Sequence, residues 1–264
     1  MKHIILVSFL FIGSLLVSNT FSQWRDLEPG ISLGVFQSPF YPQSPDGAVH
    51  IVKVDPDRHE LHLFNASHPE QGKIMSAKEW GRKEGLKVVM NAAMYQTDYR
   101  SSVSLMKTKG HVNNPRLSKD KSVLVFHPLR KSLPPVQLVD LQCDDFQSLK
   151  PLYRSMVQSI RMLSCKGKNV WQKSEKRWSI AAVGTDSSRN VLFMHVAAPH
   201  SVHEFINVLR DLPLELKRAI YMEGGSPAQL YVSTKSDTLE LTGYYSSGGR
   251  IRNAPPLPNI LGVR

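Results

Sequence analysis

Apolar and polar residues alternate along much of the chain with a period of two, the period of a half-buried β-strand. Residues 49–54 and 60–64 both alternate in this way, and the turn-forming residues Asp55, Pro56 and Asp57 separate them, so this region predicts a β-hairpin. Other apolar or alternating runs predict strands at residues 31–36, 87–90, 105–107, 111–112, 122–126, 136–141, 178–183, 191–196, 219–222, 229–233 and 238–242.

Three segments carry the signals of α-helices. Residues 77–84 lie between a serine suited to the N-cap and a glycine suited to the stop. A second helix, capped by Ser201 and ending near Leu212, has Glu204 at the spacing of a capping box. Residues 146–163 have apolar positions close to the 3.6-residue period and predict an amphipathic helix.

The order of these elements predicts the fold class. The helix that ends near Leu212 lies between two apolar strands, which implies a crossover connection. The proline-rich tail after Arg252 is expected to be an ordered but irregular strap. Because no repeat or linker divides residues 23–264, we predict one α+β domain, in which helices pack against a mixed, largely central β-sheet.

The N-terminal residues predict a cleavable secretory signal peptide. A short basic start precedes an apolar run over residues 4–17. Thr20 and Ser22 supply the small residues of a peptidase site, so residues 1–22 are predicted to be removed before Gln23. A membrane anchor is disfavoured because the run is shorter than the ~20 residues that cross a bilayer. We therefore expect a secreted or periplasmic protein with no integral membrane segment.

The net charge limits the kinds of partner. The formal charge of +11 favours anionic partners, such as phosphate-bearing glycans, acidic polymers or anionic membrane surfaces. The basic residues are spread along the chain, and no helix-turn-helix, zinc-finger or RNA-binding motif accompanies them, so nucleic acid is not expected as a partner. A surface that binds polyanions without a defined pocket remains an alternative. No particular oligomeric state is predicted.

The chain has two cysteines, Cys143 and Cys165. In an oxidising compartment such a pair usually forms a disulfide, which would join the ends of the predicted helix at residues 146–163 and contribute about 3 kcal/mol to stability. Two reduced, buried thiols are the alternative, because a bridge depends on the Cα separation.

The segment Glu223-Gly224-Gly225-Ser226 is the strongest candidate for a functional site. It places a carboxyl group directly after an apolar strand, where two glycines let the backbone turn sharply and approach a ligand. The alternative is a tight turn with a solvated glutamate.

These residues resemble the phosphodiester glycosidases, which have an Asp-Gly-Gly-Gly-Ser motif after an apolar strand. The same family has Asn-Gly-Gly-x-Phe at the end of an earlier strand, and a branch of secreted bacterial proteins has Asn-Ala-Gly-Met-Phe. This chain has Asn91-Ala92-Ala93-Met94-Tyr95 there. The likeness spans most of residues 48–233.

The chain departs from both motifs of the family. Glutamate replaces aspartate at position 223, Ser226 replaces the third glycine, and Ala92 and Ala93 replace both glycines of the other motif. The longer carboxylate arm moves the charge by about 1 Å, a displacement to which catalysis is sensitive. The departures therefore predict either a shifted substrate or a catalytically silent protein.

The resemblance implies a role for each candidate residue. Glu223 would be the general base or nucleophile, with Asp98 as its partner, and Asn91 would hydrogen-bond a sugar hydroxyl or the phosphate. The remaining candidates would form the substrate site: Arg161 and Arg177 as phosphate ligands, His195 as a lining residue, and Gly224, Gly225 and Ser226 as the closely approaching turn.

No cofactor is predicted, and nothing in the sequence indicates a divalent cation. His195, His200 and His203 form a cluster in the sequence, but no carboxylate or cysteine accompanies them at ligand spacing, so no metal site is predicted there. The motifs of nucleotide-binding loops, zinc proteases and serine hydrolases are absent from the sequence.

The sequence thus predicts a secreted hydrolase that acts on a sugar phosphodiester or a related anionic glycan of the cell envelope. A catalytically silent protein that binds envelope carbohydrate through the same cleft is the alternative.

Overall fold

The computed structural model describes residues 24–245 and 253–264. The predicted signal peptide lies outside these residues. The described strands are β1 (Trp24–Glu28), β2 (Ile31–Gln37), β3 (Ala48–Val54), β4 (Leu61–Asn65), β5 (Val88–Asn91), β6 (Met106–Thr108), β7 (His111–Asn114), β8 (Ser122–Pro128), β9 (Val136–Asp140), β10 (Tyr153–Ser159), β11 (Trp178–Asp186), β12 (Val191–His200), β13 (Leu216–Gly224), β14 (Gln229–Ser233), β15 (Thr238–Thr242) and β16 (Asn259–Val263). The described helices are α1 (Ala77–Glu84), α2 (Phe146–Leu149) and α3 (Val202–Asp211), with short 3-10 turns η1 (Pro45–Gly47) and η2 (Lys150–Leu152).

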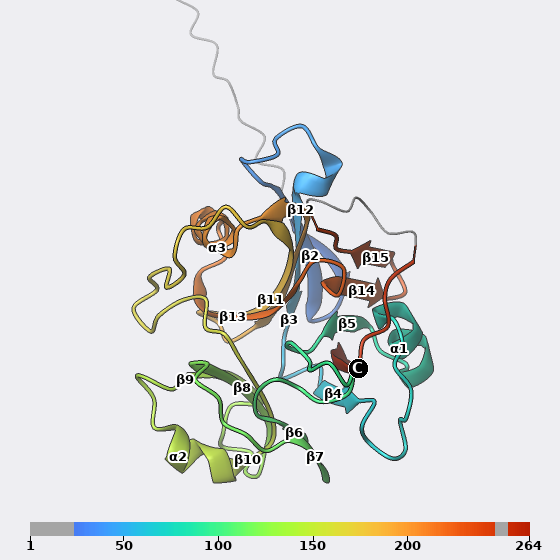
Figure 1. Ribbon diagram of the computed structural model, residues 1–264, viewed down its shortest axis with the longest axis vertical. Helices are drawn as coiled ribbons and strands as arrows, with labels where there is room; N and C mark the ends of the chain where they lie inside the picture. Colours follow the sequence, from blue (N-terminus) through green and yellow to red (C-terminus); the bar gives the residue numbers. More distant parts are fainter. Residues whose placement is uncertain (1–23, 246–252) are drawn as a thin grey trace, which may run out of the picture.

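The strands form three sheets instead of one central sheet (Figure 1). A six-stranded sheet has the order β1-β2-β3-β12-β11-β13, and two five-stranded sheets have the orders β7-β6-β10-β8-β9 and β15-β14-β5-β16-β4. Every described strand pair is antiparallel, so the predicted mixed sheet is wrong. The described helices are few and short, so the predicted α+β class is correct only in part, and most of the regular structure is β-sheet.

The six-stranded sheet contains the predicted crossover. Strand β11 pairs antiparallel with both β12 and β13, so these two strands run in the same direction on either side of it. Helix α3 connects them across one face of the sheet, at the upper left of Figure 1. Phe205 and Leu209 of α3 are buried against Ala182 and Met194 of the sheet, and this apolar contact fixes the helix.

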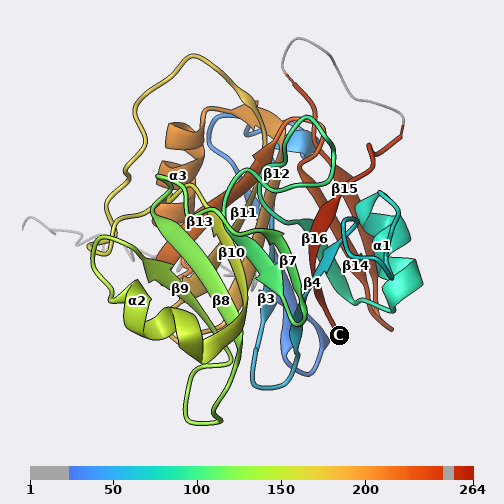
Figure 2. The same cartoon turned by 60° about the horizontal axis from the view of Figure 1, so that its bottom comes forward.

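One hydrophobic core joins the three sheets. It contains Val52 from β3, Val88 from β5 and Phe126 from β8, one residue from each sheet, and all three are fully buried. Figure 2 brings β7, β8 and β10 to the front and shows the other two sheets behind them. Because each sheet buries a face against the others, the chain positions residues from distant segments on a shared frame.

The local signals for two helices are confirmed. Ser76 and Glu79 form a capping box at the start of α1, and Gly85 ends it with a φ of 64°. Ser201 and Glu204 form the capping box of α3. These caps satisfy backbone N–H groups that have no partner within the helix, which is why the sequence signal is reliable at these points.

The helix predicted at residues 146–163 is wrong. Helix α2 ends at Leu149, the turn η2 contains Pro151, and the chain continues as strand β10. Proline removes a backbone donor and ends a helix, and β10 then pairs with β6 and β8 and is buried on both faces apart from Arg154. A strand that is buried on both faces need not alternate between apolar and polar residues. The apolar residues of β10 therefore lacked the period of two that marks a strand, and they matched the helical period by coincidence.

The C-terminal tail is not merely an irregular strap. Residues 259–263 form β16, which lies between β5 and β4 as an interior strand of the third sheet. The N-terminal strand β1, which pairs with β2, was also missed. Within the described residues, every helix is too short or too polar to traverse a lipid bilayer.

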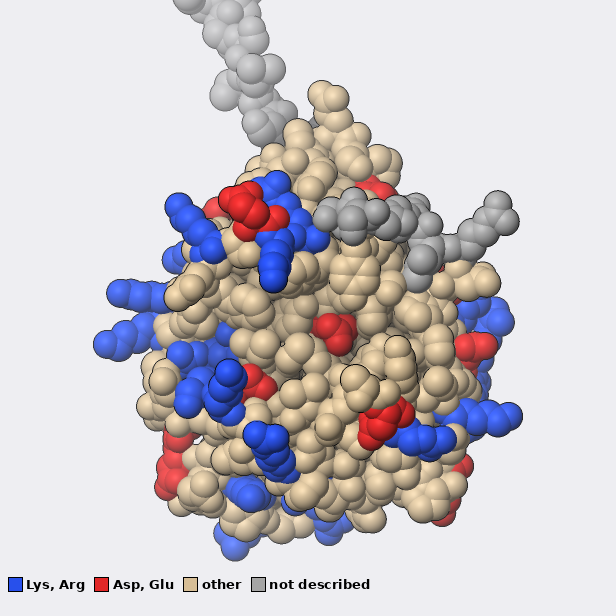
Figure 3. All heavy atoms as spheres, viewed as in Figure 1, with Lys and Arg blue, Asp and Glu red and all other residues tan. Residues whose placement is uncertain are grey.

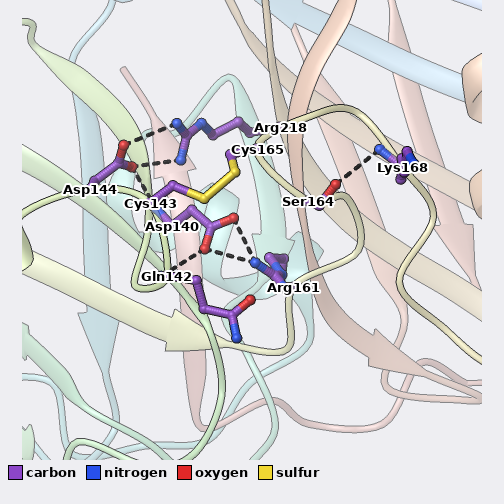
Figure 4. Close-up of a disulfide and its surroundings, with 9 residues drawn as sticks. All are labelled: Asp140, Gln142, Cys143, Asp144, Arg161, Ser164, Cys165, Lys168 and Arg218. Carbon is purple, nitrogen blue, oxygen red and sulfur yellow. Dashed lines mark hydrogen bonds and ion pairs between the residues drawn. A yellow bond between two sulfur atoms is a disulfide. The ribbon is translucent and has the colours of Figure 1, made fainter.

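The predicted disulfide between Cys143 and Cys165 is confirmed. It joins the turn after β9 to the loop after β10, and not the two ends of a helix (Figure 4). The ion pairs Asp140–Arg161 and Asp144–Arg218 lie beside it. The disulfide and the Asp140–Arg161 pair join the segments that follow β9 and β10, and the Asp144–Arg218 pair connects this region to β13 of the first sheet.

Replacing both cysteines by alanine is expected to lower the free energy of unfolding by about 3 kcal/mol, because the unfolded chain gains the entropy of an open loop. Urea unfolding of the variant and of the parent protein, with and without reductant, measures this loss. Reductant should destabilise the parent protein only, and equal stability of all four samples would contradict a structural role for the disulfide.

Candidate functional site

Glu223 stands at the end of β13, where the sheet is irregular. The pairing of β13 with β11 shifts register between Ala181 and Ala182, and Glu223 lies opposite Ala181 at this bulge. A bulge re-aims the side chains beside it. After Glu223 the chain turns through Gly225, which has a φ of 67° and donates its N–H to the Ser179 carbonyl at 2.9 Å. The predicted tight turn after an apolar strand is therefore present.

The carboxyl group of Glu223 is largely removed from solvent, although the residue as a whole is partly exposed. Burial raises its pKa from the ordinary value of 4.5 to about 7, and the N–H of Gly224, at 2.9 Å from Oε1, offsets part of this shift. Within the described residues Glu223 has no ion pair with a lysine or arginine. Glu223 is therefore only partly exposed, which differs from the fully solvated glutamate of the alternative.

Three tyrosine hydroxyl groups interact electrostatically with this carboxyl group. The charge of Glu223 contributes to raising the pKa of Tyr95, Tyr221 and Tyr245, with burial as the main cause in each case, and the pKa of Tyr95 reaches about 12. These tyrosines come from the segment after β5, from β13 and from the segment after β15. The sequence did not predict that these tyrosines interact with Glu223, although Tyr95 is the last residue of the earlier motif.

Gly224 and Gly225 cannot be replaced by a larger residue without a clash, because side chains of the protein itself pack against them. A Cβ on Gly224 would lie 2.0 Å from the Trp178 ring, and a Cβ on Gly225 would lie 2.1 Å from the Tyr245 ring. The Trp178 Nε1–H donates to the Tyr221 hydroxyl at 3.0 Å and holds the indole in place. The predicted space for a ligand over these glycines is thus filled by aromatic rings. Ser226 follows in the turn and is partly exposed.

Asn91 connects the two motifs. Its Oδ1 accepts a hydrogen bond from the N–H of Gln229 at 3.2 Å, which ties the end of β5 to the start of β14, just after the Glu223 turn. Asn91 is 2% exposed and its buried Nδ2 has no partner among the described residues. Asn91 is thus a buried residue that joins the end of β5 to the segment that follows the Glu223 turn.

The segment after Asn91 carries backbone strain. Ala93, which stands where the family motif has glycine, has a φ of 55°, a conformation that costs a residue with a Cβ about 1 kcal/mol. Met94 packs against the core of the first sheet, and the ring of Tyr95 lies 5.5 Å from that of Tyr99. The strained turn thus directs Tyr95 towards Glu223 and leaves Tyr99 exposed beside it.

Asp98 is not brought to Glu223. Its side chain is fully exposed, and its oxygens accept hydrogen bonds from the backbone of Arg100 and from Ser101 in its own loop. These hydrogen bonds, chiefly from Ser101, lower the pKa of Asp98, whereas Asp98 has no part in the raised pKa of Glu223. The contacts of Asp98 thus lie within its own exposed loop, and they give no support to the prediction that it assists Glu223.

Arg161 is held by a buried carboxylate. Its Nη1 lies 2.8 Å from both oxygens of Asp140, which is 1% exposed (Figure 4). It follows strand β10 instead of lying on a helix. Arg161 also lines a cavity of about 670 Å³ together with basic and aromatic residues, namely Lys119, Lys121, Lys173 and Trp171. Arg161 thus has a structural role, because it neutralises Asp140, and it also lies on the wall of a basic cavity.

Arg177 and His195 do not reach the site as predicted. Arg177 is paired with Glu204 at the start of α3, and this pair accounts for its raised pKa. His195 is fully buried, its Nε2 lies 3.1 Å from the Ala228 carbonyl, and burial lowers its pKa to about 3. His195 therefore supports the turn after Glu223 from beneath, and it does not line a cleft.

The histidines at positions 195, 200 and 203 do not converge. His200 contacts the Ser38 hydroxyl at 2.7 Å, and His203 contacts the Trp171 carbonyl at 2.6 Å. Each of the three has a separate protein partner, so this cluster offers no shared set of metal ligands.

Arg161→Met is expected to lower the free energy of unfolding by about 3–5 kcal/mol, because it leaves the buried Asp140 carboxylate without a cation. Urea unfolding measures the loss. Arg177→Met is the matched control, since its partly exposed pair should contribute less than about 1 kcal/mol. If the two variants lost the same small amount, the structural role of Arg161 would be refuted.

Glu223→Gln is expected to stabilise the protein at alkaline pH. Folding raises the pKa of Glu223 from 4.5 to about 7, so the folded protein binds this proton more tightly than the unfolded chain does. The resulting contribution to the free energy of unfolding is fully present below pH 4.5 and is lost as the pH rises through 7. The uncharged variant should therefore be more stable at pH 8.5 by on the order of 2–3 kcal/mol, with no gain near pH 4.

Urea unfolding at both pH values measures this difference. The exposed Glu175→Gln is the matched control and should differ little from the parent protein at either pH. A gain for Glu223→Gln that is the same at pH 4 and pH 8.5 would show that the effect is not protonation.

Comparisons with known proteins bear on this site. The sequence model of a family described as phosphodiester glycosidase matches residues 84–264. This range contains both motifs, the Tyr95 segment and strand β16. Among curated protein sequences, no significant match is found.

Solved structures share the fold. The catalytic domain of zebrafish N-acetylglucosamine-1-phosphodiester alpha-N-acetylglucosaminidase, auto-inhibited by its pro-peptide, matches with a TM-score of 0.67 and 13% identity over 91% of this chain and 85% of that one. A hypothetical protein from Synechocystis has a TM-score of 0.58 and 13% identity, over 91% of this chain and 63% of that one. A protein from Burkholderia pseudomallei has a TM-score of 0.54 and 9% identity, over 82% and 73%. At these identities the likeness establishes the fold alone.

Proposed function

Because the chain belongs to the phosphodiester glycosidase family, we propose that it hydrolyses a sugar phosphodiester or a related anionic glycan, with Glu223 as the reacting carboxyl group. The observation that carries this proposal is the setting of Glu223. It lies at the end of a buried strand, among tyrosines, with its pKa raised to about 7. A carboxyl group poised near neutrality suits proton transfer, and such shifts cluster at functional sites.

The reaction needs only one carboxylate if phosphate is the leaving group. Glu223 takes a proton from water, the water oxygen bonds to the anomeric carbon, and the bond from that carbon to the phosphate oxygen breaks with its electron pair on the phosphate. The second pKa of a phosphate monoester is about 6, so this group can leave without a proton from an acid. This agrees with the absence, among the described residues, of a second carboxylate acting on the pKa of Glu223.

The aromatic side chains suit a sugar. The ring of Tyr245 covers Gly225, and Tyr99 lies beside Tyr95; Tyr245 and Tyr99 are 48% and 55% exposed, so each offers a free face. Flat rings pack against the apolar faces of sugars, and their π-electrons favour the positive charge that develops on the sugar during bond breaking. These tyrosines therefore form the proposed platform beside Glu223.

The cavity lined by Arg161 suits the anionic part of the substrate. Trp171, which lines this cavity, has its ring 5.4 Å from that of Tyr221, and Tyr221 responds to the charge of Glu223. Lys119, Lys121 and Lys173 line the same cavity, and lysines bind phosphate as point charges. The proposed substrate would place its sugar at Glu223 and its phosphate or aglycone towards the lysines.

Carbohydrate binding without turnover is the second candidate function. It is favoured by the rings of Trp178 and Tyr245, which fill the space over the two glycines, and by the longer glutamate at a position where the family has aspartate. A polyanion-binding surface has less support, because the basic side chains in Figure 3 are dispersed over the face and not gathered in one tract.

Export is a further part of the proposal. The basic start, apolar run and small-residue cleavage site at residues 1–22 support a signal peptide, and the disulfide between Cys143 and Cys165 is the kind of bond that persists in oxidising compartments. A secreted or periplasmic location agrees with a glycan of the cell envelope as substrate.

Turnover of chromogenic aryl sugar-1-phosphodiesters, tested as a panel of sugars, is the experiment that decides between the two functions. Glu223→Gln should lower kcat by about 10²- to 10⁴-fold, the range for loss of a general acid or base, while Asp98→Asn should stay within about twofold of the parent protein. Because the glutamine variant is expected to fold stably, its loss of activity would not be a loss of structure.

The outcomes are distinct. Sugar binding by the parent protein without turnover, and equal binding by Glu223→Gln, would support the silent alternative. Full activity of Glu223→Gln would exclude Glu223 as the reacting group, and binding that collapses between low and physiological salt without sugar selectivity would indicate a surface for polyanions.

A further inference from the structure

Glu60, His62 and His127 form a second cluster of chemically active side chains, on elements that do not carry Glu223. Glu60 immediately precedes β4 and His62 lies on it, whereas His127 lies on β8 of a different sheet. One ligand atom from each of the three side chains lies within 4.8 Å of the other two. The packing of two sheets thus brings together two imidazoles and one carboxylate.

Two nitrogens of the cluster lack hydrogen-bond partners. The Nε2 atoms of His62 and His127 are buried and unpartnered among the described residues, and the His127 side chain is 7% exposed. The other ring nitrogen of His127, Nδ1, lies 2.7 Å from the Ser155 hydroxyl. When Nδ1 donates to that hydroxyl, the Nε2 lone pair faces the Glu60 carboxylate, and a cation between them would satisfy both.

The distances match a tetrahedral metal ion. His127 Nε2 lies 3.0 Å from Glu60 Oε1, and His62 Nε2 lies 3.6 Å from Glu60 Oε2. Ligand bonds of about 2.0–2.1 Å at a tetrahedral angle separate neighbouring ligand atoms by about 3.3 Å, and these contacts, although made to different oxygens of Glu60, are close to that separation.

We propose that Glu60, His62 and His127 bind one divalent transition-metal ion, for which zinc is the best match. Two imidazoles and a carboxylate are ligands that zinc accepts, whereas magnesium and calcium prefer oxygen atoms alone. Ser155 would act as the outer partner that fixes His127 for metal binding. This proposal does not depend on the function proposed for Glu223.

The cluster is accessible and keeps one position open. Glu60 and His127 line a cavity of about 400 Å³, together with Lys109 and two arginines, Arg58 and Arg154. Three protein ligands leave a fourth position of the metal free, and the basic residues around the cavity favour an anion or hydroxide there. Lys109 Nζ lies 2.9 Å from Glu60 Oε1, so metal binding must displace this exposed lysine, whose side chain is 48% exposed.

Metal content measures the proposal directly. The purified protein is stripped with a chelator, dialysed against Zn²⁺ and analysed for bound zinc, and Co²⁺ is then substituted as a spectroscopic probe. We expect one zinc per chain, retained in excess Mg²⁺ and Ca²⁺, and a visible Co²⁺ absorption typical of four-coordinate nitrogen and oxygen ligands.

Variants then locate the ion. Glu60→Gln, His62→Gln and His127→Asn should each weaken zinc binding at least tenfold, and asparagine is chosen because it tolerates the φ of 57° at position 127. His203→Gln, which alters a histidine outside the cluster, is the matched control and should bind zinc as the parent protein does.

Several results would overturn the proposal. These are the absence of stoichiometric zinc in the parent protein, undiminished binding in the three variants, or an equal loss in His203→Gln. Melting temperatures in the presence of chelator show whether each variant folds. If His127→Asn does not fold, the cobalt spectrum and the other two variants decide the outcome.

Discussion

The partial burial of the Glu223 carboxyl group, with no lysine or arginine paired to it among the described residues, is the constraint on which the site depends. Removing a charge from water is unfavourable, so the protein holds this group near the midpoint of its titration at neutral pH instead of as a fixed anion. The bulge in β13 and the tight turn at Gly225 fix where the carboxyl group lies, and the rings of Trp178 and Tyr245 lie directly over Gly224 and Gly225. An arginine paired with this carboxyl group would stabilise the anion and lower its pKa, and none of the described arginines is so paired.

The frame that produces this setting is made by antiparallel sheets that share one core. Asn91 and Gln229 belong to neighbouring strands of one sheet, whereas Glu223 belongs to another, and the single hydrogen bond from the Gln229 N–H to Asn91 lies where the two sheets meet. His195 supports the same turn from inside by its contact with the Ala228 carbonyl. Asn91 and His195, which the sequence suggested as substrate ligands, are therefore parts of the scaffold around Glu223.

The same physical principle separates the two candidate centres. At Glu223 a carboxyl group is buried among tyrosines, and the low polarity adjusts its proton affinity. At Glu60 a carboxylate faces two imidazole nitrogens without hydrogen-bond partners, an arrangement that a metal ion completes. The chain belongs to a family of glycosidases, and the second cluster adds to that fold a site whose chemistry is independent of the first.

The sequence by itself determined the local features of this protein. These include the capping boxes at Ser76 and Ser201, the crossover through α3 and the turn after Glu223. The hairpin predicted for residues 49–54 and 60–64 is wrong, because the two segments form strands β3 and β4 of different sheets, and β3 pairs with β2 and β12 while β4 pairs with β16. Each depends on residues close together in the chain, where periodicity and turn chemistry act directly. Only the tertiary structure decided that residues 153–159 form a strand, that the C-terminal residues enter a sheet, and that Arg161 binds Asp140. It also selected the tyrosines around Glu223, because such neighbours are set by packing between distant segments, which local periodicity does not encode.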